Sequence, residues 1–264
     1  MSALQTPAVL LAVDLGNTKV RFGFYQAGVK IADLSVSART HRLADEYVLL
    51  LEEFCSRQGI DRVEGSILAS VVPSLTPILT AALERCTGRA PMLVGHGIRT
   101  GLDIRTDYQA ELGADIVANA VGARAKLEPP FAVIDLGTAT TISLVDRADR
   151  FQGVAILPGL SASARALAES CAGLPEISIA PPRALLCKNP ADSLAGGLVY
   201  GFASMVDGMI GRIQREYGLD QLALIACGGS AGKVIPHCTE QITLDPDLTL
   251  DGLCRLWELN KKRK

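Results

Sequence analysis

Several patterns that mark common nucleotide-binding and hydrolytic proteins are missing from this 264-residue sequence. It has no G-x-x-x-x-G-K-[ST] segment, so it has no P-loop. No G-x-G-x-x-G follows a predicted strand, so a Rossmann dinucleotide site is not supported. The serines of GLSASARAL, residues 159–167, form no G-x-S-x-G nucleophile elbow. Any phosphate chemistry must therefore be sought in other turns.

The sequence also lacks a strong charge excess and an ordered cysteine pattern. Its formal net charge is −2, which gives no electrostatic reason to expect nucleic acid or an anionic membrane as partner. The seven cysteines are scattered, with no C-x-x-C pair, which favours reduced thiols over disulfides or a zinc site. The first residues have no basic region before a long apolar core, and no run reaches the ~20 apolar residues of a membrane span. We therefore expect a cytoplasmic protein with no membrane and no nucleic acid as partner.

What the sequence does contain is one acidic turn pattern in two copies. AVDLGNTKVRFGFY, residues 12–25, predicts a buried strand that ends at an aspartate, then a glycine turn and a returning strand. Residues 132–146, AVIDLGTATTISLVD, repeat this pattern, and predicted helices follow each copy. We expect an internal duplication of two α/β halves, 1–118 and 119–264, that face each other across a cleft.

The first turn has the residues of a metal-and-phosphate corner. A tight turn around Gly16 exposes backbone N–H groups, which can bind an anion. Thr18 adds a hydroxyl donor, and Asn17 and Lys19 can reach outward. Asp14 cannot bind phosphate itself, but it can hold Mg²⁺, which takes only one or two carboxylates and keeps several waters.

The second turn repeats this chemistry around Asp135 and Thr138. Two such corners across a cleft suit phosphoryl transfer, in which the protein mainly positions groups and neutralises charge. The alternative is that each copy is only an Asp-Gly hairpin with a capping carboxylate. The occurrence of both copies, each between two apolar strands, favours the phosphate site.

These motifs look like those of the acetate kinase–hexokinase–actin-like superfamily, and from residue 8 to about 255 the chain resembles the type III pantothenate kinases. The pair D-x-G-N-T and D-x-G-T-A-T-T, in this order, is the most specific part of the resemblance. Further matching segments are SVVPSLTPIL at 70–79, LGAD at 112–115, GVAILPGLSASARAL at 153–167, AGGLVYG at 195–201, CGGSA at 227–231 and LTLDGL at 248–253. The resemblance implies duplicated actin-like (ribonuclease H-like) domains, with mixed sheets flanked by helices.

The resemblance also implies an activity: ATP-dependent phosphorylation of the primary hydroxyl of pantothenate, the first step toward coenzyme A. Members of the family are homodimers that use Mg²⁺ and a monovalent cation, K⁺ or NH₄⁺. By position, Asp14–Arg21 would bind the nucleotide phosphates, Thr138 would contact ATP and Asp135 would ligate the monovalent cation. Asp115 would accept the proton of the acceptor hydroxyl.

Asp115 also suits this role chemically. It follows Gly113 and Ala114, small residues that permit close approach of a substrate, and it stands at the start of a predicted helix. In a loose transition state a carboxylate need only orient the hydroxyl and accept its proton late. From the sequence alone, the alternative is that Asp115 only caps the helix.

The chain departs from the family pattern around the acceptor. Ile116 stands where the family has an arginine, Thr106 replaces a common tyrosine, and Pro190 replaces a threonine. An arginine offers a bidentate charged fork to a carboxylate such as that of pantothenate. Three interpretations stay open: a pantothenate kinase with a rearranged pocket, a paralogous kinase of another small alcohol, or a nucleotide-binding regulatory protein without catalysis.

Overall fold

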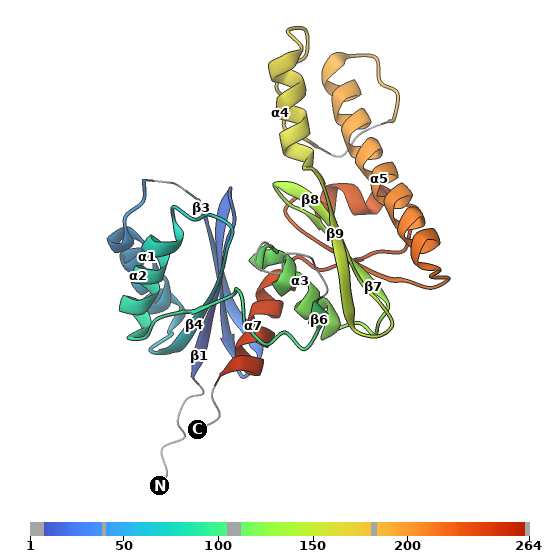
Figure 1. Ribbon diagram of the computed structural model, residues 1–264. Coiled ribbons are helices and arrows are strands. Elements are labelled where there is room, and N and C mark those ends of the chain that lie inside the picture. The colour runs from blue at the N-terminus through green and yellow to red at the C-terminus, as the bar shows by residue number, and fades with distance from the viewer. Residues whose placement is uncertain (1–7, 39–40, 105–111, 181–183, 262–264) are drawn as a thin grey trace. The chain divides into compact units, whose positions relative to one another are not determined.

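The structure is a computed structural model, and it describes residues 8–38, 41–104, 112–180 and 184–261 (Figure 1). The chain divides into two compact units. Unit 1 consists of Met1–Gly101, Asp107–Ala125 and Leu248–Lys264, and unit 2 of Leu102–Thr106 and Lys126–Asp247. These units differ from the expected halves, because the boundary at 118/119 falls inside a helix and the C-terminal helix belongs to unit 1.

Unit 1 is built on a five-stranded sheet with the order β3-β2-β1-β4-β5. The first three strands form an antiparallel meander, and β4 and β5 extend the sheet by parallel pairing. The strands are β1 (Val9–Leu15), β2 (Lys19–Gln26), β3 (Val29–Ser37), β4 (Val63–Ser70) and β5 (Met92–Leu93). The helices are α1 (Ala44–Gln58), α2 (Thr76–Thr87), α3 (Ala114–Arg124) and α7 (Leu248–Asn260).

The two faces of the unit 1 sheet have different partners. Val9, Leu11, Val13 and Leu15 of β1 belong to the buried cluster that α1 and α2 complete. Because side chains alternate between the faces of a strand, Asp14 points to the opposite face. That face is covered by α7, which packs on β1, β2 and β4 (Figure 1).

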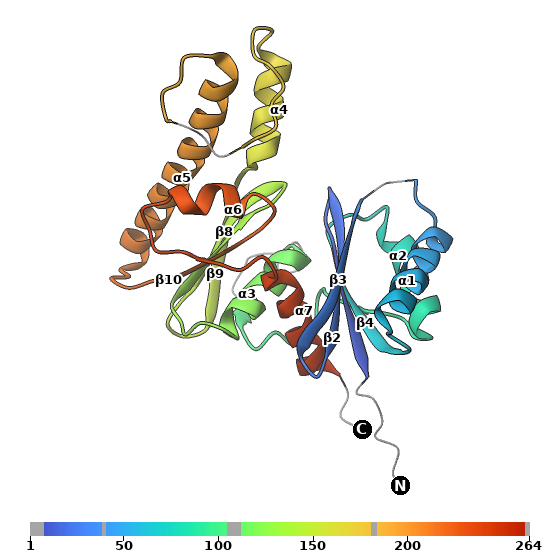
Figure 2. The same ribbon diagram turned by 180° about the vertical axis from the view of Figure 1, so that it is seen from behind.

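Unit 2 is built on a six-stranded sheet with the order β11-β10-β7-β8-β9-β6. Its strands are β6 (Asp103–Ile104), β7 (Phe131–Leu136), β8 (Ala139–Val145), β9 (Arg150–Pro158), β10 (Ala223–Cys227) and β11 (Thr243–Leu244). Its helical elements are α4 (Leu160–Ser170), α5 (Pro190–Tyr217), α6 (Ala231–Val234) and the 3₁₀ turn η2 (Ile235–His237). Figure 2 shows α6 and β10 from behind.

The two units share one topology. The order β11-β10-β7-β8-β9 repeats the order β5-β4-β1-β2-β3, with the same parallel and antiparallel pairings. Asp14 and Asp135 stand at the same place, one residue before the end of the first strand. The predicted fold class, duplicated α/β units with mixed sheets flanked by helices, is confirmed.

Helix α5 is long and apolar enough, by length and composition alone, to cross a membrane. Core helices of folded proteins pass the same test. One face of α5 is buried in the main apolar cluster of unit 2, through Leu198, Val199, Phe202, Val206 and Ile210. This one-sided burial is what an amphipathic core helix shows.

Candidate active site

The first acidic turn joins β1 to β2 in unit 1. Asp14, half-buried at the strand end, lies opposite Arg21 in the antiparallel ladder and opposite Ala69 of β4. The turn is closed by one backbone hydrogen bond, in which the amide of Gly16 donates to the carbonyl oxygen of Lys19 at 3.0 Å. The strand pairing thus fixes the carboxylate beside a short, well-defined turn.

The first turn is open on its outer side. Asn17, Thr18 and Lys19 are all exposed, so their side chains are accessible to a ligand. A Cβ added to Gly16 would meet only the Lys19 carbonyl oxygen, at 3.4 Å. The carbonyl oxygen of Thr18 accepts a hydrogen bond from the amide of Ala38, which follows β3, at 3.0 Å. This hydrogen bond ties the middle of the turn to the end of β3.

The second acidic turn joins β7 to β8 in unit 2, and it is one residue shorter. Residues 137–139 separate the paired strands, whereas residues 16–19 do so in unit 1. The register places Ala139 at the position of Lys19, so the second turn carries no cationic side chain. Thr138, in the middle of this turn, is exposed.

Two glycines from other elements clamp the second turn. A Cβ on Gly228, just after β10, would overlap Oδ1 of Asp135 and lie 2.5 Å from the carbonyl carbon of Leu136. A Cβ on Gly159, just before α4, would overlap the carbonyl oxygen of Thr138. Gly228 also has φ = 93°, which L side chains rarely adopt. Sequence reasoning missed Gly159 as a site residue, and for Gly228 its only signal was the glycine pair after a strand.

The third predicted carboxylate, Asp115, lies in the first turn of α3. The N-cap residue of this helix is Gly113, and Asp115 is the second helical residue. Its Oδ1 accepts a hydrogen bond from the amide of Ile116 at 2.8 Å. Burial raises the pKa of Asp115, against backbone hydrogen bonds that lower it. A carboxylate with a raised pKa is a stronger proton acceptor.

The neighbours of Asp115 leave it little freedom. A Cβ on Gly113 would lie 2.5 Å from Oδ1 of Asp115, so a larger residue there would require the carboxylate to move. Ala114 is buried, and Ile116 is only 9% exposed. Gly113 and Ala114 therefore come directly before the carboxylate of Asp115, and the side chain of Ile116 after it is buried. Thr106 lies outside the described residues.

Pro190 has a structural role that the sequence analysis did not foresee. It is the first residue of α5, where proline is favoured because the missing N–H would have no intrahelical partner. The preceding Asn189 caps the helix by accepting a hydrogen bond from the amide of Asp192 at 2.9 Å. The spacing of apolar residues predicts a helix from about Asp192, and the helix begins two residues earlier, at Pro190.

The segment GGSAG, residues 228–232, matches the G-x-S-x-G pattern of a nucleophile elbow and follows a strand. Ser230 has the helical backbone angles φ = −102° and ψ = −6° and is buried, whereas an elbow presents an exposed serine on a strained turn. Its amide donates to the carbonyl oxygen of Leu136 at 2.9 Å, as the amide of Val71 donates to that of Leu15 at 3.1 Å. The segment is part of the clamp on the second turn.

The two strand-end aspartates, Asp14 and Asp135, are the candidate ligands for the cations that the resemblance implies. Among the described residues, no group of three or more His, Cys, Asp or Glu side chains is placed to hold a metal ion. Mg²⁺ does not need one, because it binds through one or two carboxylates together with waters and substrate phosphates. Asp14 beside a turn with exposed donors fits such an ion, and the carboxylate of Asp135 suits a cation that prefers oxygen ligands.

Two solved structures resemble the chain in fold. A ROK family glucokinase from Streptomyces griseus, in complex with glucose and AMPPNP, gives a TM-score of 0.56 at 12% identity, over 94% of this chain and 99% of that one. The ethanolamine utilization protein EutJ from Carboxydothermus hydrogenoformans gives 0.51 at 15% identity, over 95% and 90%. Together with the duplicated topology, these likenesses define the class by fold: the chain has the fold of the acetate kinase–hexokinase–actin-like superfamily.

Sequence similarity identifies the family within this class. A family model described as type III pantothenate kinase matches residues 10–212. Type III pantothenate kinases from Moorella thermoacetica and Geotalea daltonii are each 36% identical over 256 residues, which cover 96% of this chain and 100% of the relative. The chain belongs to the type III pantothenate kinase family.

Proposed function

We propose that this protein is a kinase that transfers the γ-phosphoryl group of ATP to the primary hydroxyl of pantothenate, the first step of coenzyme A synthesis. One observation carries the proposal. Asp14 and Asp135, each followed by a glycine turn with an exposed threonine, occupy the same register position in the two units of a chain from this family. A strand-end carboxylate beside exposed donors suits the charge neutralisation that phosphoryl transfer requires.

The two turns divide the work. In the first, Asp14 would hold Mg²⁺, while the backbone of Gly16 and the side chains of Asn17, Thr18 and Lys19 would bind the phosphates. These exposed donors support that assignment, because the transition state spreads negative charge over several oxygens. In the second turn, Thr138 would contact ATP, and Asp135 would ligate a monovalent cation, K⁺ or NH₄⁺. The bound cations would supply positive charge to the phosphates.

Asp115 would accept the proton from the acceptor hydroxyl. Its raised pKa and its place beside Gly113 and Ala114 support this role, because a base needs proton affinity and room for the acceptor to approach. We extend the substrate-binding assignment to Gly113, Ala114 and Thr106. We also propose that the protein works in the cytoplasm as a homodimer, with a small molecule as its partner.

A second acceptor is favoured by one observation. Ile116 follows Asp115 directly and is 9% exposed, and an apolar side chain cannot form a charged hydrogen bond with a carboxylate. Losing one such bond costs about 1.5–3 kcal/mol, or roughly one to two decades in affinity. The alternative is therefore a paralogous kinase with a different, less anionic alcohol as acceptor. Loss of catalysis, with nucleotide binding kept, is the third interpretation.

One assay separates these interpretations. The purified chain is incubated with ATP, Mg²⁺ and K⁺, and ADP release is measured against pantothenate and a panel of neutral polyols. Turnover with pantothenate supports the proposal, and turnover only with another alcohol supports the paralogous kinase. Saturable nucleotide binding without turnover would contradict both. Asp115→Asn should abolish turnover, whereas Asp61→Asn, which changes an exposed carboxylate in a loop, should not.

A further inference from the structure

Helix α3, which carries Asp115, is buried along almost its whole length. Every residue from Ala114 to Ala123 is buried except Asp115 itself. Packed interiors do not deform smoothly, so a helix enclosed in this way moves only if its neighbours move. The position of the carboxylate is therefore set by what α3 packs against.

The helix that packs most closely on α3 comes from the far end of the chain. Helix α7 crosses α3 with glycine on both sides of the contact. A Cβ on Gly252 would overlap the carbonyl oxygen of Ala118, and a Cβ on Gly122 would lie 2.5 Å from the carbonyl oxygen of Leu248. The two backbones thus touch without intervening side chains, and the helices cannot approach each other further.

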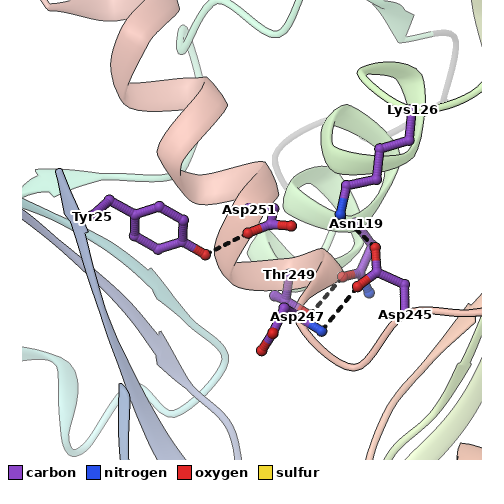
Figure 3. Close-up of polar contacts among 7 residues, drawn as sticks. All are labelled: Tyr25, Asn119, Lys126, Asp245, Asp247, Thr249 and Asp251. Atoms are coloured by element: carbon purple, nitrogen blue, oxygen red, sulfur yellow. Dashed lines mark hydrogen bonds and ion pairs between the residues drawn. The ribbon is translucent and has the colours of Figure 1, made fainter. Parts of the chain in front are cut away.

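A buried hydrogen bond fixes the register of the crossing. The hydroxyl of Thr249 donates to Oδ1 of Asn119 at 2.7 Å (Figure 3). Asn119 is 2% exposed and Thr249 is 6% exposed. A shift of one helix along the other would separate the two groups and leave a buried polar group without a partner, which costs free energy. The hydrogen bond therefore favours one axial alignment of the two helices.

Helix α7 is itself attached to the unit 1 sheet. The hydroxyl of Tyr25 donates to Oδ1 of Asp251 at 2.6 Å (Figure 3). Farther along α7, the indole ring of Trp257 lies on β4, where a Cβ on Gly65 would come 2.6 Å from its Cη2. The sheet that carries Asp14 therefore holds α7, and α7 holds α3.

We propose that α7 positions the catalytic base, and that Thr249 and Gly252 are positioning residues for the phosphoryl transfer. They act through α3 and do not touch the substrate. This inference rests on the proposed function, in which Asp115 accepts the acceptor's proton. Displacing a reacting group by about 1 Å can cost about 100-fold in rate, so the alignment of α3 should matter for kcat.

Two variants of Thr249 test the hydrogen bond. Thr249→Val keeps the branched shape and removes the hydroxyl, and it should lower kcat about 10-fold, with the Kd for ATP unchanged. Thr249→Ser keeps the hydroxyl and should restore kcat to near the wild-type value. Binding stoichiometry for an ATP analogue, measured by calorimetry, gives the folded fraction, so kcat is expressed per folded molecule.

Gly252→Ala tests the crossing itself, and it should lower kcat about 100-fold. The control is Leu51→Ala in the α1 and α2 cluster, which contains no residue of α3 or α7. It should lower the Tm as much or more, and leave kcat per folded molecule unchanged. This comparison separates positioning from loss of stability.

The outcomes are distinct. A fall in kcat for Thr249→Val and Gly252→Ala, with rescue by Thr249→Ser, supports the inference. If the wild-type protein turns over and both variants keep the wild-type kcat, this inference is overturned and the proposed function stands. A Leu51→Ala variant that loses kcat per folded molecule as strongly as Gly252→Ala would also overturn it. If the wild-type chain phosphorylates no alcohol in the panel, the proposed function fails, and the inference fails with it.

Discussion

The two acidic turns start from the same sequence pattern and end in different environments. The first spans residues 16–19, carries Lys19 and receives a hydrogen bond from the amide of Ala38. The second spans residues 137–139, carries no cation and is pressed between glycines of two other elements. An open cationic turn can adjust to the end of a triphosphate. A clamped turn presents a fixed set of oxygens, which suits a cation of defined size.

The difference teaches that D-x-G followed by threonine specifies a strand-end turn but not its role. We propose that the surroundings of each turn set its role: Asn17 and Lys19 in the first, Gly159 and Gly228 in the second. Each prediction below would break or sharpen this comparison.

The largest effect is expected from removing the two strand-end carboxylates in turn. Asp14→Asn should lower kcat by about 10³-fold, because a group that holds the phosphate-bound cation stabilises the transition state directly. Asp135→Asn should lower kcat by about 10²-fold, and it should abolish the activation by K⁺ that we propose for the wild-type protein. Steady-state kinetics at varied Mg²⁺ and K⁺ measure both. Equal losses with identical ion dependence would show that the turns do not divide the work.

Next in size is the steric contrast between the turns. Gly228→Ala should lower the free energy of unfolding by about 3 kcal/mol, because the new Cβ overlaps Asp135 and the residue has a positive φ. Gly16→Ala should cost less than about 1 kcal/mol, because its Cβ has only an ordinary contact. Urea unfolding of both variants gives the comparison. A tolerated Gly228→Ala would mean that the second turn is not clamped.

A smaller effect is expected at the hairpins that follow. Asp146 accepts hydrogen bonds from Ala148, Arg150 and Gln152, whereas the unit 1 hairpin turns through Ala27–Gly28 without a charge. Burial alone would raise the pKa of Asp146, but the hydrogen bonds from Arg150, Ala148 and Gln152 outweigh it and lower the pKa to about 2.

At pH values above about 4, the pKa of an unfolded aspartate, Asp146 should therefore add about 1 kcal/mol to the free energy of unfolding. This energy allows for solvent screening of the partly exposed Arg150. This contribution is lost as the pH falls from about 4 through about 2. Asp146→Asn should lower the Tm at pH 7 and flatten its pH dependence in this window. An unchanged slope between pH 4 and 2 in the variant would assign the acid sensitivity to other groups.

The smallest effect concerns the stability cost of Asp115, the proposed catalytic base. The folded protein raises the pKa of Asp115, so its stabilising contribution is complete below about pH 4 and is lost as the pH rises through the raised pKa. At pH 7, Asp115→Asn should therefore raise the free energy of unfolding while it removes activity. Calorimetry at pH 4 and pH 7 measures the difference. A variant that is less stable at pH 7 would contradict the burial argument.

Local sequence patterns were enough to predict many of the strands, turns and helices. Strand alternation and the glycine turns gave the two meanders, and helical spacing gave a helix from about Asp192 to Tyr217, observed as Pro190–Tyr217. Both turn aspartates fall where the pattern put them, at strand ends. These features depend on residues close in sequence, so a sequence read one segment at a time reveals them.

What could not be predicted depends on contacts between distant segments. The short helix expected near DGLCRLWEL is observed as Leu248–Asn260, and it belongs to unit 1 because Gly252 meets the backbone of Ala118. The clamps at Gly159 and Gly228 arise in the same way, since nothing in their own segments shows which turn they approach. A single sequence carries no signal for such pairs.

The central claim, that this duplicated fold transfers phosphate to pantothenate, is tested most directly by following the phosphate. Wild-type protein is incubated with Mg²⁺, K⁺, pantothenate and ATP radiolabelled on the γ-phosphate. The account predicts that label appears on the primary hydroxyl of pantothenate, and that Asp115→Asn forms almost none of this product. Label that stays in ATP, or appears only as inorganic phosphate, would contradict it.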